Sequence, residues 1–351
     1  MPTTTSSKPL TLTYLTLDVF TSTPYLGNPL AVVLIPASQR SHLTQEVKQR
    51  IAREFNFSET VFLHVLDDDE ARDGLGVTSR DIDIFTIDEE LPFAGHPTVG
   101  TAFLVLKHFG WGHVTTLRTK AGGIAVRELE GGEGGKVKAT IPHAVHIHRQ
   151  TLGGLLSATQ KDGGEDTETK GLIEAALSDD AEIREAELNG PVVSIVRGMT
   201  FLLAKLPSLE HLAKVSTAKR LDFNQVKGLL DKGEWEGGFV CRYYYVPTEE
   251  EAEKDEETKS RNEFKFRTRM VELGMEDPAT GSAACTLASY LTVSGREVGG
   301  ARFELTQGVE MGRQSEIEVE TTAVEEGGEV KVKDLYLGGT AVVVMKGEIY
   351  V

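Results

Sequence analysis

The hydrophobic residues of the chain follow two spacings, which together predict more strands than helices. Leu15, Leu17 and Val19 alternate with polar residues, the period-two pattern of a strand. Residues 30–35 form a continuous apolar run that suits a buried strand. One amphipathic helix is expected from apolar residues spaced by four, which are Leu43, Val47, Ile51 and Phe55. Further strand patterns occupy residues 61–65, 81–87, 191–196, 200–206, 239–246, 316–319, 330–332 and 341–345.

Two other apolar segments predict short helices that are buried on every side, and they are copies of one pattern. Both read Pro-x-x-Gly-[Ser/Thr]-Ala, and the ungapped pairs are Phe85/Phe266, Pro97/Pro278, Gly100/Gly281, Thr101/Ser282 and Ala102/Ala283. A proline near the first turn followed by an apolar run is typical of a core helix. Neither run reaches the roughly 20 apolar residues that a bilayer requires. The repeat therefore predicts two related halves whose sheets wrap one helix each.

The residue before each proline of this repeat is polar and titratable. It is His96 in the first copy and Asp277 in the second. At the start of a helix, unpaired N–H groups and the positive end of the dipole attract an anion such as a substrate carboxylate. A structural role remains open for each residue alone, Asp277 as a helix cap and His96 as a hydrogen-bonded core residue. Their joint occurrence in a repeat favours a functional role.

Glu59 is a further candidate, because it precedes the strand pattern of residues 61–65. Strand alternation places its side chain on the same face as Val61, Leu63 and Val65. A carboxylate directed at an apolar interior is costly unless it is paired or performs chemistry. Burial also raises a carboxyl pKa toward the range that is useful for moving protons at neutral pH. A solvated glutamate at the entry to a strand is the alternative interpretation.

Composition narrows the classes of partner. The 351 residues carry a formal net charge of −17, from 54 acidic and 37 basic side chains, so nucleic acid is not an expected partner. Two cysteines, Cys241 and Cys285, indicate a reducing compartment and a packing role. No Cys/His cluster has metal-ligand spacing, and no glycine-rich loop suits a phosphate. The first twenty residues lack the features of a signal or transit peptide, so we expect a cytoplasmic protein without a membrane span.

Two domains are expected. The first consists of residues 1–142 and a last strand at about 338–351, and the second consists of residues 143–337. Two polar segments in the second half, 161–170 and 249–259, are expected to be solvated loops. The second of these, EEEAEKDEETK, has no apolar anchor, and its role cannot be inferred.

Four segments together resemble the PhzF-like phenazine-biosynthesis isomerase family, whose relatives include diaminopimelate epimerase. They are LDVFTSTPYLGNPLAVVL, REFNFSETVFL, ELPFAGHPTVGTA and MEDPATGSAA, and with their order and spacing the resemblance covers nearly the whole chain. It implies an α+β fold of two pseudo-symmetric domains, each a rolled sheet or barrel around a central helix, with the site in the cleft between them. It also implies a homodimer that needs no cofactor.

The resemblance assigns roles to individual residues. Glu59 matches the acid/base of the family, and His96, Asp277 and Ser282 match residues that line the substrate site. Helix-start amides near Gly95, Gly281 and Ser282 would hold a carboxylate, with Ser58 as a further substrate-binding residue. The epimerase relatives use a cysteine at each helix start, and the absence of both here argues against a two-thiol mechanism. The approach to MEDPATGSAA is also about three residues shorter than in the family, and the acidic run before it is longer, which leaves substrate selectivity open.

The leading hypothesis is a cofactor-independent isomerase, in which Glu59 moves a proton between carbons of a small carboxylate metabolite. One alternative is an amino-acid racemase or epimerase that uses Glu59 and Asp277 from opposite faces. Another is a small-acid-binding or regulatory protein on the same scaffold, against which the complete set of candidate residues counts. The sequence does not identify the substrate.

Overall fold

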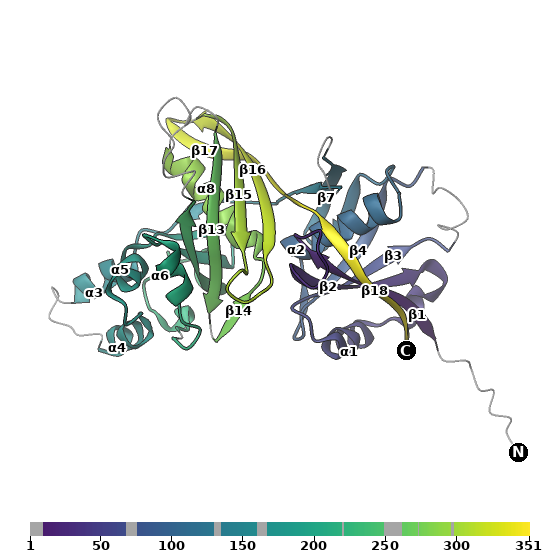
Figure 1. Ribbon diagram of the computed structural model, residues 1–351, viewed down its shortest axis with the longest axis horizontal. Coiled ribbons are helices and arrows are strands. Elements are labelled where there is room, and N and C mark those ends of the chain that lie inside the picture. The colour runs from purple at the N-terminus through teal and green to yellow at the C-terminus, as the bar shows by residue number, and fades with distance from the viewer. Residues whose placement is uncertain are drawn as a thin grey trace, which may run out of the picture. The chain divides into compact units, whose positions relative to one another are not determined.

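A computed structural model describes residues 10–67, 76–129, 135–159, 167–219, 221–248, 262–272, 274–295 and 298–351. The acidic run 249–259 lies outside them. The chain forms two compact units, which are Met1–Ala139 with Thr340–Val351, and Thr140–Gly339 (Figure 1). Among the described residues, no helix is both long and apolar enough to span a membrane.

In the described part of the first unit, the sheet has the strand order β18–β1–β2–β3–β4–β6–β7–β8, with a short β5 beside β4. The β2–β3 and β4–β6 pairs are parallel, and the others are antiparallel. The strand bounds are β1 Thr11–Val19, β2 Asn28–Pro36, β3 Thr60–Val65, β4 Ser79–Phe85, β5 Glu90–Leu91, β6 Thr116–Thr119, β7 Gly122–Glu128, β8 Val137–Thr140 and β18 Ala341–Tyr350.

Helices pack on both faces of this sheet. The predicted amphipathic helix is confirmed as α1 (Gln45–Phe55), which the Thr44 hydroxyl caps and which ends at Asn56 in the left-handed region. It follows a 3-10 helix, η1 (Ala37–His42), and packs against Val33 and Phe62. The first predicted core helix is α2 (Gly95–Phe103), continued by a π-helical turn, η2 (Leu104–His108).

Helix α2 contacts β1, β2 and β3, and it is buried from His96 to Ala102. Gly100 allows this close packing, because a Cβ atom there would lie 2.6 Å from Leu30 Cδ2 and 2.7 Å from Val19 Cγ2. The glycine of the sequence repeat is thus required by contact between the helix and the strands.

The second unit repeats this topology. Its strand order is β9–β10–β11–β12–β13–β15–β16–β17, with a short β14 beside β13. The β11–β12 and β13–β15 pairs are parallel, at the same two places in the order as in the first unit. The strand bounds are β9 His146–Ile147, β10 Val192–Val196, β11 Met199–Lys205, β12 Phe239–Pro247, β13 Glu263–Glu272, β14 Met275–Asp277, β15 Gly299–Gln307, β16 Ser315–Glu326 and β17 Glu329–Gly339.

The second predicted core helix is α8 (Gly281–Gly295), which runs beside β15, β16 and β17 (Figure 1). Its buried residues surround the helix, as an all-apolar pattern predicts. The predicted α+β architecture, with a sheet around a core helix in each half, is confirmed.

The second unit also contains helices that the sequence did not predict. They are α3 (Leu152–Thr159), α4 (Thr167–Ala176) and α5 (Ala181–Asn189). The expectation of a loop at 161–170 is wrong for residues 167–170, which begin α4, and residues 161–166 lie outside the described part. Further along, residues Leu209–Lys214 form α6 and residues Phe223–Gln225 form a 3-10 turn, η3.

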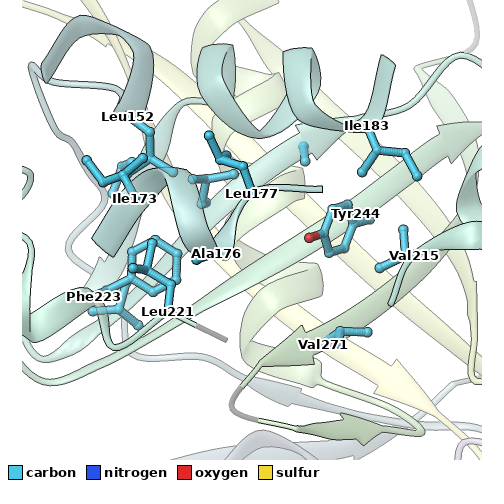
Figure 2. Close-up of a cluster of buried hydrophobic side chains, with 14 of the residues drawn as sticks. Leu152, Ile173, Ala176, Leu177, Ile183, Val215, Leu221, Phe223, Tyr244 and Val271 are labelled. Carbon is cyan, nitrogen blue, oxygen red and sulfur yellow. The ribbon is translucent and has the colours of Figure 1, made fainter. Parts of the chain in front are cut away.

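These helices cover the sheet with a second hydrophobic core. Figure 2 shows its side chains, among them Ile173 from α4, Leu177 just after this helix and Tyr244 from β12. A buried ion cluster adjoins this core. Arg242 of β12 bonds to Glu272 of β13 at 3.0 Å, to Glu187 of α5 at 3.2 Å and to the last carbonyl of α4. The helical layer is therefore joined to the sheet by both apolar packing and charge.

Candidate active site

The end of α1 and the start of β3 determine where Glu59 lies. Asn56 adopts a left-handed conformation (φ 54°) that ends α1, and Thr60 begins β3 between Ala31 and Phe85 of the neighbouring strands. Glu59 immediately precedes this buried strand, and its side chain is only 18% exposed. The backbone pairing of Thr60 with a strand on each side thus holds the Glu59 carboxyl group at the edge of the core.

Glu59 meets His96 of α2. Its Oε2 atom lies 3.3 Å from His96 Nδ1, a distance for an ion pair, but the two atoms lack hydrogen-bond geometry. The His96 side chain is 5% exposed. Two titratable groups therefore face each other in a largely dry environment, in which a proton on either changes the energy of the other.

The pKa of Glu59 is raised above its ordinary value of 4.5. Burial is the main cause, since it disfavours the charged form, and a hydrogen bond from the Ser58 side chain partly offsets it. A raised carboxyl pKa brings proton uptake and release closer to neutral pH. Ser58 itself is exposed, so its hydroxyl contacts Glu59 from the solvent side.

The first turn of α2 supplies backbone donors beside this pair. Gly95 is the first residue of the helix, His96 the second and Pro97 the third. The first N–H groups of a helix have no acceptor within it, and the preceding residue, Ala94, offers no side-chain cap. This helix start can therefore accept an anion next to Glu59.

The second unit holds the other candidates at the start of α8. Asp277 ends β14, where it pairs with Met270 of β13. Its Oδ2 atom accepts a hydrogen bond of 2.6 Å from the Thr280 hydroxyl. Gly281 and Ser282 are the first two residues of α8, so their N–H groups point out of the helix start.

The two helix starts differ from the expectation drawn from the repeat. His96 lies inside the first turn of α2, whereas Asp277 lies in a strand before α8 begins at Gly281. The interpretation that both residues occupy equivalent helix-start positions is therefore wrong. Hydrogen bonds in the second copy explain the difference, because Asp277 is paired in the β13–β14 hairpin and Thr280 O accepts the first helical bond from Ala284.

The structure thus forms two groups of candidate residues, one in each unit. Ser58, Glu59, Gly95 and His96 lie together in the first unit, and Asp277, Gly281 and Ser282 lie together in the second.

Two polar groups escaped the sequence analysis. One consists of Gln307 and Thr280, which bond to the Asp277 segment. The only sequence sign of this group was the Gln307-Gly308 pair. Gln307 lies 30 positions from Asp277 along the chain, so no local pattern predicted that the two residues are in contact. The other consists of His146, His148 and Asp231, for which a His-x-His strand was the only sequence sign.

The ligand atoms of His146, His148 and Asp231 lie within 4.8 Å of one another, a spacing that a metal ion could use. The bonds of these residues do not fit a metal site. His148 accepts the Asp231 N–H at Nδ1 and contacts Ser194 Oγ through Nε2, and burial lowers its pKa to about 4. Arg149 also bonds the Asp231 carboxylate at 3.0 Å. Both ring nitrogens of the neutral His148 side chain are already used in hydrogen bonds, and the Arg149 guanidinium occupies the Asp231 carboxylate. These contacts indicate a structural hydrogen-bond network and not a metal site.

Two sheets that each pack a core helix, and a carboxyl group beside an imidazole at one helix start, are compatible with an enzyme of the isomerase and epimerase class. Comparison with known proteins assigns the family. Residues 17–347 match the model of the family described as phenazine biosynthesis-like protein, and the chain belongs to this PhzF family. It is accordingly an isomerase of that family, as the sequence predicted.

Relatives agree with this assignment, and a solved structure agrees with the fold. An uncharacterized isomerase of Mesorhizobium japonicum is 31% identical over 97% of this chain and 99% of its own. The trans-2,3-dihydro-3-hydroxyanthranilate isomerase of Pseudomonas chlororaphis is 31% identical over 86% of this chain and 87% of its own. The fold is similar to that of a PhzF-family protein from Bacillus anthracis, with a TM-score of 0.67, 19% identity and coverage of 97% and 100%.

Proposed function

We propose that the protein is a cofactor-independent isomerase in which Glu59 carries a proton between two carbons of a small carboxylate. The observation that supports this proposal most directly is the carboxyl group of Glu59, buried and 3.3 Å from His96, with a raised pKa. A carboxyl group whose pKa is raised accepts a proton more readily than a solvated glutamate does, which suits a group that takes up and returns a proton.

The proposed reaction needs one base and no external acid. Glu59, as the carboxylate, removes a proton from an acidic C–H bond, and the electron pair of that bond shifts into the adjacent unsaturated system of the substrate. The same carboxyl group then delivers the proton to the far carbon of that system, and the double bond moves. Proton transfer by a positioned side chain typically contributes about 10²–10⁴-fold to the rate.

His96 and Ser58 act on Glu59 in this scheme. His96 Nδ1 interacts with the charged form of the carboxyl group, and the Ser58 hydroxyl hydrogen-bonds to it. Burial favours the neutral acid and raises the pKa of Glu59, and the Ser58 hydrogen bond partly offsets this by favouring the carboxylate.

Binding of the substrate carboxylate is assigned to the helix starts. The N–H groups of Gly95, Gly281 and Ser282 and the dipoles of α2 and α8 would stabilise its negative charge. Asp277 and the Ser282 hydroxyl would orient the rest of the molecule. In this proposal the two units act on one substrate molecule, which occupies the cleft expected from the sequence.

The name of the Pseudomonas relatives supplies the first compound to test. At 31% identity over most of both chains, trans-2,3-dihydro-3-hydroxyanthranilate is a reasonable probe of the substrate class. We further propose that the protein works in the cytoplasm as a homodimer. Light scattering should then give about twice the chain mass of 38.3 kDa, whereas the single mass would contradict the dimer.

Isotope exchange tests the reaction type. The wild-type protein is incubated with this compound in D₂O, and NMR locates hydrogen and deuterium in the product. Movement of hydrogen from one carbon to another, with the double bond shifted, supports the isomerase. Exchange at one carbon with loss of its chirality would instead indicate that the protein is a racemase. Binding of the compound without exchange would indicate a binding protein.

A further inference from the structure

Gln307, the last residue of β15, is completely buried beside the start of α8. Its amide offers two N–H donors and one oxygen with two acceptor positions. A buried amide that left any of these unpaired would be costly. The partners of this amide therefore show what the residue holds in place.

All four hydrogen-bonding positions of the amide are used. Nε2 donates to the Asp277 carbonyl at 2.8 Å and to Thr280 Oγ1 at 3.0 Å. Oε1 accepts from the Thr280 N–H at 3.3 Å and from the Tyr243 hydroxyl at 3.1 Å. One side chain thus connects β12, β14 and the residue that precedes α8.

These partners allow only one orientation of the amide. The Asp277 carbonyl can only accept and the Thr280 N–H can only donate, so a flipped amide would face both with the wrong atom. The bond that Gln307 donates to Thr280 Oγ1 leaves the hydroxyl proton directed elsewhere. That proton is donated to Asp277 Oδ2 at 2.6 Å.

Gly308, the residue after Gln307, packs with its backbone against the turn between Asp277 and α8. Gly308 has a φ of +75°, and a Cβ atom there would lie 2.7 Å from the Pro278 carbonyl oxygen and 2.6 Å from that of Arg313. The Gln307–Gly308 segment is therefore packed directly against the turn that leads from Asp277 into α8.

We propose that Gln307 is a positioning residue, which through Thr280 fixes the Asp277 carboxylate and the first N–H groups of α8. That Gln307 fixes these groups in place is argued from the contacts alone. The effect expected on turnover rests on the proposed function. Because a small misplacement of a reacting group can cost about 10²-fold in rate, loss of this network should lower kcat more than it raises KM.

Four variants separate this role from general support of the fold. Gln307→Leu removes the amide, Thr280→Val removes the hydroxyl at nearly constant shape, and Thr280→Ser retains it. Thr292→Val is the matched control, because Thr292 lies within α8, is 8% exposed like Thr280, and bonds to Ala288 and Thr321 away from the helix start. Each variant is measured by hydrogen–deuterium exchange and by kinetics with trans-2,3-dihydro-3-hydroxyanthranilate.

Exchange in peptides that cover Asp277–Ala284 should rise about tenfold in Gln307→Leu and Thr280→Val, with β16 unchanged. Thr280→Ser should restore the slow exchange, and Thr292→Val should leave this segment as in the wild type. kcat should fall about 10- to 100-fold in the first two variants, with a smaller change in KM. Wild-type exchange in Gln307→Leu, or equal effects of Thr280→Val and Thr292→Val, would overturn the proposal.

The exchange measurement needs no substrate, so it decides the positioning role even if the isomerase reaction itself fails. Failure of the proposed function would appear as wild-type turnover by Glu59→Gln, which leaves the Gln307 contacts intact.

Discussion

Glu59 Oε2 and His96 Nδ1 lie 3.3 Å apart, although the two residues come from different elements of the first unit. The glutamate precedes β3 and the histidine lies in the first turn of α2, so packing of this helix on the sheet creates the pair. Neither side chain is well solvated, and the raised pKa of Glu59 follows from that burial.

The pH dependence of turnover should report this raised pKa. If Glu59 acts as the carboxylate, kcat/KM rises with pH as the free enzyme loses the proton from this group. The midpoint of that rise is expected above pH 4.5, the ordinary value for a glutamate. Initial rates between pH 4 and pH 9 would show it. A rate that is already constant from pH 4.5 upward would contradict the assignment.

The contribution of Glu59 to the stability of the fold should also depend on pH, but it should decrease as pH rises, whereas kcat/KM increases. Between pH 4.5 and the raised pKa, the folded protein keeps a proton that the unfolded chain has lost, so increasing pH favours unfolding. This contribution is fully present below the unfolded pKa and is lost as pH rises through the folded pKa.

Glu59→Gln lacks this titration and should become more stable relative to the wild type as pH increases from 4.5 to 8. Thermal unfolding of both proteins across this range measures the difference, with Glu128→Gln as the control for a partly exposed glutamate. A constant difference, or one that changes in the other direction, would contradict a raised pKa.

Replacement of His96 should affect catalysis more than folding. His96→Gln keeps a polar side chain of similar length but removes the imidazole next to Glu59. A decrease of about 10²-fold in kcat/KM is expected, at the lower end of the range for acid–base groups. His108→Gln, an exposed histidine of the same unit, is the control. Equal activity of both variants would show that His96 is only a packing residue.

The buried ion cluster of the second unit should dominate the stability of its helical layer. In Arg242→Met, the carboxylates of Glu187 and Glu272 remain buried without their guanidinium partner. This should lower the free energy of unfolding by about 3–5 kcal/mol in urea denaturation.

Arg302→Met provides the comparison for Arg242, because Arg302 also contacts two glutamates but is 40% exposed. Its loss should cost at most about 1 kcal/mol. Similar costs for the two variants would indicate that water reaches the Arg242 cluster.

The sequence predicted the features that depend on local pattern. The repeated Pro-x-x-Gly-[Ser/Thr]-Ala motif located both core helices, and Gly100 shows why a glycine is needed in the first of them. Spacing by four residues located α1. In each of these cases the signal lies within one element, where burial imposes a regular spacing.

Features fixed by distant residues could not be predicted. Helix α8 begins at Gly281 in a turn bonded by Gln307, which comes from a later strand. Arg242 meets Glu187 55 positions away and Glu272 30 positions away, and no local pattern links them. The α4 helix was missed because its buried apolar residues, Ile173 and Ala176, form too short a periodic signal.

The most direct test of Glu59 as the proton carrier is the turnover of Glu59→Gln with trans-2,3-dihydro-3-hydroxyanthranilate, beside Glu128→Gln. The amide is nearly the same size as the carboxyl group but cannot take a proton from carbon. This role of Glu59 predicts a loss of at least about 10²-fold in kcat for Glu59→Gln, with compound binding and Tm near those of the wild type, and full activity for Glu128→Gln. Wild-type turnover by Glu59→Gln would contradict it.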